Sequence, residues 1–210
     1  MAESEGRFSK ARLEAFSDGV IAVIITIMVL DLKPPESHEP AALLKLWPSF
    51  AIYLFSFVFV AIYWINHHNL LIAARRVTAT LIWANNALLF CLSLIPFATA
   101  YVGDTRMAPF PTMAYGALQL ACALAFSLVV STIAAQRRDE GDFMAHFRPR
   151  RTQDIAALVV YAAGTALAAF SPYGALGLYV LVALAYFVPG LIAEVAERRG
   201  RARPPTTTSR

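Results

Sequence analysis

Apolar residues form six long blocks along this chain, and polar residues gather in short stretches between them. A helix needs about 20 apolar residues to cross the ~30 Å hydrocarbon layer of a bilayer. Each block is long enough to do so, the fifth only marginally, and the pattern predicts an all-α integral membrane protein with six transmembrane helices. The blocks fall at about 12–32, 47–73, 77–103, 109–135, 153–171 and 173–196.

Composition agrees with this pattern. Of the 210 residues, 58% are hydrophobic and only 15% are charged, whereas soluble domains carry about 25% charged residues. Six spans leave no room for a soluble catalytic domain. We therefore predict a single six-helix transmembrane domain over residues 1–200 and a disordered cytoplasmic tail over residues 201–210, which are rich in Pro, Thr and Arg.

Lysine and arginine are distributed unequally between the two sides of the predicted membrane segment. With successive connections assigned to alternate sides, one side holds 15 of the 18 basic residues and the other holds only Lys33, Lys45 and Arg106. The positive-inside rule then places both termini in the cytoplasm of a multi-pass cell-membrane protein. The net charge of +4 reflects this topology, so we expect the lipid bilayer, and not nucleic acid, as a partner.

The first apolar block contains a carboxylate, Asp18. The longest uncharged run in this block is the twelve residues from Gly19 to Leu30. As a helix these residues span roughly 18 Å. For the block to cross the membrane, Asp18 must lie below the membrane surface, where an unpaired carboxylate is costly. A helix-capping role for Ser17 or Asp18 would start the helix too late to cross. Asp18 is therefore a candidate functional residue.

Donors for such a carboxylate occur in the next two blocks. The predicted topology places them on the same side of the membrane as Asp18 and at similar depth. The spacing of Trp64, His67 and His68 predicts that they share one helix face. The polar residues concerned are Trp64, Asn66, His67, His68, Asn69, Trp83, Asn85 and Asn86.

Three interpretations of this polar group stay open at this point. It could be a metal site, although adjacent histidines point about 100° apart on a helix and only one carboxylate is near. It could relay protons through Asp18 and a histidine. It could also be a structural hydrogen-bond network that holds the first three helices together, which is compatible with a channel.

Thr26 is the only hydroxyl in the apolar half of the first block. It either bonds the carbonyl four residues earlier or lines a pore. Val23, Thr26, Ile27 and Leu30 share one helix face. The other faces are apolar too, so the periodicity does not indicate which face meets lipid and which meets an axis.

The motifs of the first three blocks resemble the signature of the transmembrane protein 175 family of potassium channels. The resemblance covers the first half of the chain motif by motif and the rest by topology. A single six-span unit is similar to the prokaryotic members, which assemble as homotetramers; animal members carry two units per chain. The residues concerned are Arg12-x-x-x-Phe16-Ser17-Asp18-Gly19-Val20, Thr26, the acidic residue that ends the block, Trp64-x-x-His67-His68, Asn85 and Pro96-Phe97.

This resemblance implies a homotetramer around a central pore lined by the first helix. It implies a hydrophobic constriction at Val23, Ile27 and Leu30, with Thr26 contributing to cation selectivity. A larger aliphatic residue is more usual at the position of Val23, which implies a slightly wider pore and weaker selectivity. The signature residues implied to form the hydrogen-bond network are Arg12, Phe16, Ser17, Asp18, Trp64, His67, His68 and Asn85.

The residues themselves also favour an unusual channel. The sequence has no Thr-Val-Gly-Tyr-Gly loop for a carbonyl cage and no arginine-rich span for voltage sensing. Walker, zinc and nucleophile motifs are missing, so we predict neither an enzyme nor a cofactor. Such a pore gates through apolar side chains and selects by width and dipoles.

We therefore predict a channel that passes monovalent cations, potassium in weak preference to sodium. Two alternatives are a proton-coupled or proton-conducting secondary transporter that uses Asp18 and a histidine, and a structural membrane subunit without transport of its own.

Overall fold

The computed structural model describes the backbone of residues 9–35, 37–137 and 141–201, and the side chains of residues 9–35, 37–137 and 154–186. No strand occurs in this part of the chain. The helical elements, in chain order, are α1 (Lys10–Ile27), the 3₁₀ turn η1 (Met28–Asp31), α2 (Pro40–Leu44), α3 (Trp47–Ile72), α4 (Ala79–Ser93), α5 (Ile95–Asp104), α6 (Pro109–Ala135), α7 (Gly141–Leu167) and α8 (Pro172–Arg201).

Prolines and one threonine mark where several of these helices begin. Pro48, Pro109 and Pro172 lie in the first turns of α3, α6 and α8, where a residue without an N–H loses no intrahelical hydrogen bond. Thr78 caps α4, because its hydroxyl accepts a hydrogen bond from the Leu81 N–H at 3.2 Å. These local signals place α6 on the same residues as the predicted block 109–135.

The third predicted span is broken into two helices. Helix α4 ends at Ser93 and α5 begins at Ile95, with Leu94 between them. Pro96 lies in the first turn of α5, where it cannot donate to a carbonyl of the preceding turn. The break therefore follows from the proline, and the two helices together still form an apolar segment of 26 residues.

Four helical segments among the described residues are long and apolar enough to cross a membrane: Lys10–Asp31, Trp47–Ile72, Ala79–Asp104 and Pro109–Ala135. They match the first four predicted spans. The apolar parts described in the last two helices, Asp154–Leu167 and Pro172–Tyr186, are shorter, so six spans stay a prediction.

The polar connection between the predicted blocks 109–135 and 153–171 is helical from Gly141 onward, because α7 begins there. Charge keeps a segment out of the bilayer without preventing a helix, and the arginines of this segment are good helix formers. The tail predicted over 201–210 lies outside the described residues except for Arg201, the last residue of α8.

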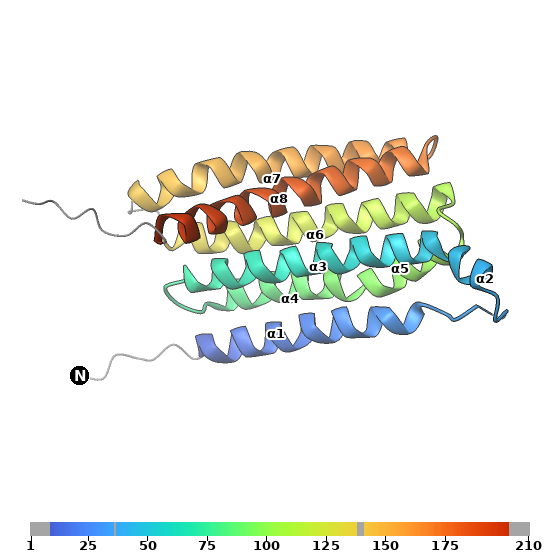
Figure 1. The fold of residues 1–210 in the computed structure, drawn as a ribbon. Coiled ribbons are helices and arrows are strands. Elements are labelled where there is room, and N and C mark those ends of the chain that lie inside the picture. Colours follow the sequence, from blue (N-terminus) through green and yellow to red (C-terminus); the bar gives the residue numbers. More distant parts are fainter. Residues whose placement is uncertain (1–8, 36, 138–140, 202–210) are drawn as a thin grey trace, which may run out of the picture.

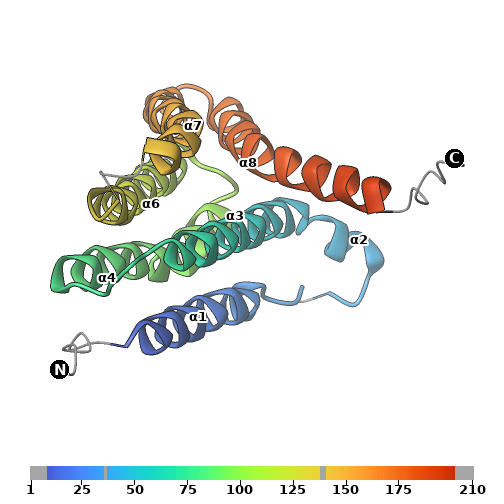
Figure 2. The same cartoon turned by 90° about the vertical axis from the view of Figure 1, so that its left-hand side faces the viewer.

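The long helices run side by side in a bundle with α1 at one edge (Figure 1). Helix α1 packs against α3, α4 and α5, and α6 joins these to α7 and α8. Figure 2 shows α1 at the opposite side of the bundle from α7. The start of α1 and the end of α8 lie at the same end of the bundle (Figure 1). One side of α1 consequently has none of the described helices of its own chain against it (Figure 2).

Candidate functional site

One face of α1 is buried against the rest of the chain. Its side chains recur every three or four residues, and α3, α4 and α5 are the elements packed against this helix. Five residues form this buried face. Four of these residues are apolar, and the fifth is Ser17, whose side chain is fully buried with 0% exposure. The buried residues of this face are Leu13, Ser17, Ile21 and Ile24, continued by Met28 at the start of η1.

Ser17 belongs to a buried hydrogen-bonded triad that joins three helices. The Asn85 amide of α4 donates from Nδ2 to Ser17 Oγ at 3.0 Å, and Ser17 Oγ donates to the Leu13 carbonyl at 2.8 Å. The Asn85 Oδ1 lies 2.6 Å from His67 Nε2 of α3. A carbonyl oxygen only accepts, so in this arrangement His67 carries its proton on Nε2 and donates. The triad therefore fixes α1, α3 and α4 in one register.

Asp18 makes a separate contact outside this triad. Trp64 Nε1 of α3 donates to Asp18 Oδ1 at 2.9 Å. Asp18 is half-buried and Trp64 is 44% exposed. The ring of His68 lies beside the Trp64 ring, with centroids 6.5 Å apart, and no hydrogen bond joins Asp18 to His67 among the described residues.

The prediction that Trp64, His67 and His68 share one face is therefore wrong in part. His67 is 1% exposed and turns into the triad, whereas Trp64 and His68 are exposed. Residues three apart are neighbours on a helix, but their side chains diverge by about 60°. The boundary between the buried and the exposed surface of α3 falls between His67 and Trp64. The polar group thus divides into an inner triad (Ser17, His67, Asn85) and an outer pair (Asp18, Trp64) with His68 beside it.

Two residues of the signature lie apart from both clusters. Arg12 is exposed, and among the described residues no hydrogen bond or ion pair joins it to either cluster. Phe16 is 57% exposed on α1. Both lie on the exposed side of α1, which none of the described helices of the same chain covers.

The predicted constriction residues lie on this uncovered side as well. Val23 is 57% exposed and Leu30 is 78% exposed, and Ile27 between them is also exposed. Thr26 is exposed, and its hydroxyl lies 3.0 Å from the carbonyls of both Ala22 and Val23. Its proton is held by the helix's own backbone, so the hydroxyl presents oxygen lone pairs outward.

Two basic side chains bind the end of α3, a contact that was not predicted from the sequence. Lys10 Nζ donates to the Ile72 carbonyl at 2.9 Å, and Arg137 Nε donates to the Ala73 carbonyl at 2.7 Å. The last carbonyls of a helix lack partners and carry partial negative charge. These two cations therefore tie the ends of α1 and α6 to the end of α3. The sequence did contain a sign of these contacts, because Lys10 and Arg137 lie at the ends of the apolar blocks that became α1 and α6.

A second buried network was also missed. Ser56 Oγ of α3 lies 2.7 Å from the Tyr115 hydroxyl of α6, and Thr99 of α5 donates to Ser56 Oγ at 2.7 Å. All three are buried. Each is an isolated hydroxyl in an apolar block, so the sequence gives no sign that they meet.

Comparison with known proteins places these features in context. Residues 12–96 match the sequence model of a family described as the endosomal/lysosomal potassium channel TMEM175. The chain is 41% identical over 181 residues to a potassium channel of Chryseobacterium sp. (strain P1-3). The aligned region covers 86% of this chain and 94% of that protein.

More distant relatives extend the comparison. The chain is 29% identical over 138 residues to the endosomal/lysosomal proton channel TMEM175 of Homo sapiens, which covers 60% of this chain and 27% of the human protein. The fold is similar to the crystal structure of a lysosomal potassium-selective channel TMEM175 homolog from Chamaesiphon minutus. That comparison has a TM-score of 0.76 at 27% identity and covers 86% of this chain and 97% of the other.

Proposed function

Because the chain belongs to the TMEM175 family of potassium channels, we propose that it is itself a potassium channel whose pore is lined by α1. In this proposal six spans form one subunit, and four subunits surround a central axis. The bacterial relative of similar length carries the name potassium channel, as does the structural neighbour from Chamaesiphon minutus.

The uncovered face of α1 is the observation that carries this proposal. Val23, Ile27 and Leu30 are exposed on the same helix whose opposite face is buried. Four copies of this face around an axis make an apolar neck. An apolar neck controls conduction by admitting or excluding water, so these three residues form the proposed constriction.

Selectivity in this proposal comes from Thr26 together with the width of the neck. The Thr26 proton is directed to carbonyls of its own helix, which leaves lone pairs to face a permeating cation. Four such hydroxyls offer a partial substitute for the water that a potassium ion sheds. Val23 is short, so we expect the preference for potassium over sodium to be weak.

The inner triad and the outer pair hold the pore helix in place. Asn85 and His67 position Ser17 from inside the subunit, and Trp64 holds the Asp18 carboxylate. Arg12 and Phe16 are exposed beside them, and we propose that they contact a neighbouring subunit. The signature residues then serve assembly and register, with both termini on the cytoplasmic side.

Flux from purified protein in vesicles tests this function. Separate potassium, sodium and proton gradients should give a potassium flux larger than the sodium flux, without coupling to protons. If Asp18→Asn abolished proton-driven exchange in a correctly assembled protein, a proton-coupled transporter would replace the channel. Vesicles with no cation flux at all would point to a structural subunit.

A further inference from the structure

A small cavity lies between α3, α6, α7 and α8, apart from the pore helix. Its volume, counted as space open to the centre of a water molecule, is about 40 Å³, and one water needs roughly 10–15 Å³ on that measure. The cavity therefore has room for about three or four non-hydrogen atoms.

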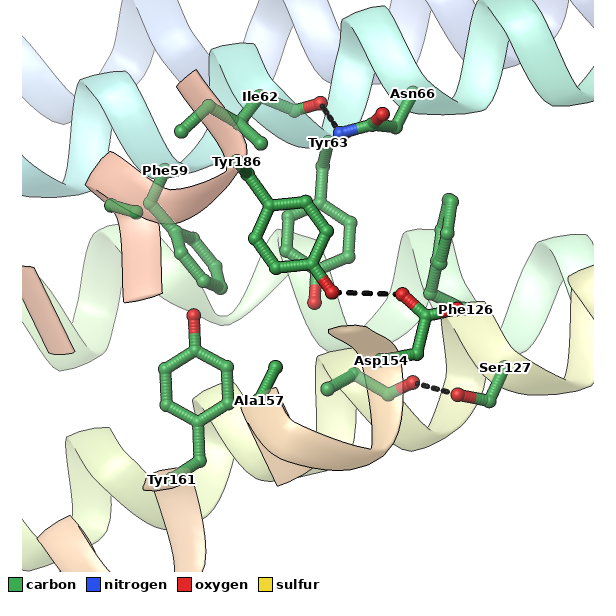
Figure 3. A pocket seen from close by; sticks show the side chains of 12 residues that line it. Phe59, Ile62, Tyr63, Asn66, Phe126, Ser127, Asp154, Ala157, Tyr161 and Tyr186 are labelled. Carbon is green, nitrogen blue, oxygen red and sulfur yellow. Dashed lines mark hydrogen bonds between the residues drawn. The ribbon is translucent and has the colours of Figure 1, made fainter. Parts of the chain in front are cut away.

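Most of the cavity wall is carbon, and aromatic rings supply much of it (Figure 3). The ring centroids of Phe59 and Tyr63 are 4.8 Å apart, and Phe126 meets Tyr63 edge to face at 5.6 Å. Tyr161 of α7 meets Phe59 edge to face at 6.4 Å. An ion would lose its water against this wall without gaining enough partners, so the wall favours a neutral molecule.

Several polar side chains of the lining are already engaged within the protein. The Tyr186 hydroxyl donates to Asp154 Oδ1 at 2.8 Å, and Asp154 and Tyr186 both have further interactions. Ser127 and Asn66 each donate to a carbonyl of their own helix, at 2.9 Å in both cases. The groups that select a ligand must therefore lie elsewhere in the wall.

Two tyrosine hydroxyls of the lining have no hydrogen-bond partner among the described residues. They belong to Tyr63 of α3 and Tyr161 of α7, which pack against the same ring, that of Phe59. Tyr161 is only 4% exposed. Figure 3 shows its hydroxyl pointing away from α7 and the Tyr63 hydroxyl pointing away from α3, toward the space between the two helices. A buried O–H without an acceptor is costly, so the cavity favours a ligand that brings one.

The acceptor that suits two converging O–H donors is a carbonyl oxygen, because it has two lone pairs and no proton of its own. Short alkyl groups on that carbonyl match the carbon wall. The position of the cavity also limits the source of such a group. Tyr63 lies nine residues before Ile72, the last residue of α3, which is roughly 14 Å along the helix. The ester groups of lipids lie outside the hydrocarbon core, so we do not expect them at this depth.

We propose that this cavity binds a small neutral carbonyl compound, a short ketone or ester dissolved in the bilayer, through hydrogen bonds from Tyr63 and Tyr161. The bound molecule joins α3 to α7 and so stabilises the packing of the last two helices on the rest of the bundle. The site is independent of the pore proposed for α1.

Thermal unfolding of the full-length protein in detergent tests the site without reference to ion flux. Acetone should raise the unfolding temperature, whereas isobutene, which has nearly the same shape and no oxygen, should raise it much less. Tyr161→Phe should weaken the apparent affinity for acetone about threefold to tenfold, the size expected for losing one neutral hydrogen bond. Tyr173→Phe is the matched control, because Tyr173 is 59% exposed and lies outside the cavity, and it should bind acetone as the parent does.

A second variant keeps the test decisive if Tyr161→Phe does not fold. Ala157 lines the cavity and is 6% exposed, so Ala157→Val fills part of the space and should abolish the acetone shift. Equal shifts from acetone and isobutene, or full acetone binding by either cavity variant, would overturn the proposal.

Nanodiscs separate a free carbonyl compound from a lipid ester. Ester-linked and ether-linked phosphatidylcholine differ in their carbonyl groups, and we expect the same unfolding temperature in both, with acetone raising it equally. Stabilisation by the ester-linked lipid alone, with no further shift from acetone, would assign the cavity to a lipid and contradict the proposal.

Discussion

The two faces of α1 differ in surroundings far more than in composition. Both are mainly aliphatic, yet Ile21 is 1% exposed and Val23, two residues later, is 57% exposed. The buried face packs against α3, α4 and α5, and the residues of the other face are exposed among the described residues. Hydrophobicity alone therefore does not assign a role to a residue of this helix; the neighbours of each face do.

The same division separates two adjacent polar residues. Ser17 is fully buried in the inner triad, whereas Asp18 is half-buried and bonds Trp64. Consecutive residues on a helix point about 100° apart. Ser17 therefore faces the subunit interior, whereas Asp18 lies at its boundary. We expect mutations on the buried side to change stability and mutations on the uncovered side to change assembly or conduction.

The largest expected effect comes from a pair of adjacent truncations, Ile24→Ala and Val23→Ala. Ile24 is 3% exposed in the core, and removing such a side chain costs about 2–5 kcal/mol. Val23→Ala leaves no cavity inside the subunit, so its unfolding temperature should stay close to that of the parent. In bilayer recordings Val23→Ala should raise conductance and reduce the preference for potassium, because a smaller side chain widens and wets the neck. Unchanged currents in Val23→Ala would move the pore elsewhere.

Asn85→Ala should give the next largest loss of stability. The change leaves the His67 Nε2–H without its acceptor and removes a donor from Ser17, and a stranded buried group costs about 1–3 kcal/mol. Asn86→Ala is the control, since Asn86 makes no hydrogen bond within the described part of the chain. Thermal unfolding in detergent should separate the two, and equal midpoints would mean that the triad contributes nothing to stability.

Asp18→Ala should act on assembly more than on the folded subunit. It removes the acceptor of the Trp64 indole, a partly exposed bond worth about 1 kcal/mol, and size-exclusion profiles should show a smaller tetramer fraction. Trp64→Phe breaks the same bond, so the double variant should lose little more than either single variant. Additive losses would show that Asp18 has a different partner in the assembled protein.

Thr26→Val should give the smallest effect and only in selectivity. The substitution keeps the shape and removes a hydroxyl whose bonds run to its own helix, so unfolding should change by less than about 0.5 kcal/mol. Reversal potentials under mixed potassium and sodium should shift toward lower selectivity. Thr132→Val removes a similar hydroxyl, bonded to the Leu128 carbonyl of α6 at 2.8 Å, and should leave the reversal potential unchanged.

Much of the helical framework could be predicted from the sequence. The block 109–135 became α6 with the same bounds, and the first three blocks became segments that end within two or three residues of their predicted limits. Length and hydropathy decide such segments because a bilayer demands them locally. The break at Leu94 was missed, although Pro96 was a visible signal for it, because a proline near the middle of an apolar block does not stop the block from spanning.

The common level of the polar groups along the bundle was likewise predictable, since it follows from topology and helix rise. Their pairing was not. The sequence placed Ser17, Asp18, Trp64, His67 and Asn85 at one level, but it could not show that Asn85 would bond Ser17 and His67 while Trp64 bonded Asp18.

By itself, then, the chain determined its apolar segments, its charge asymmetry and the level at which polar residues meet. Only the tertiary structure decided which face of α1 is buried, because that helix is apolar all round from Val20 to Leu30 apart from Thr26. Periodicity needs a contrast between polar and apolar positions. Where that contrast is absent, the packing of α3, α4 and α5 selects the buried face and leaves the other exposed.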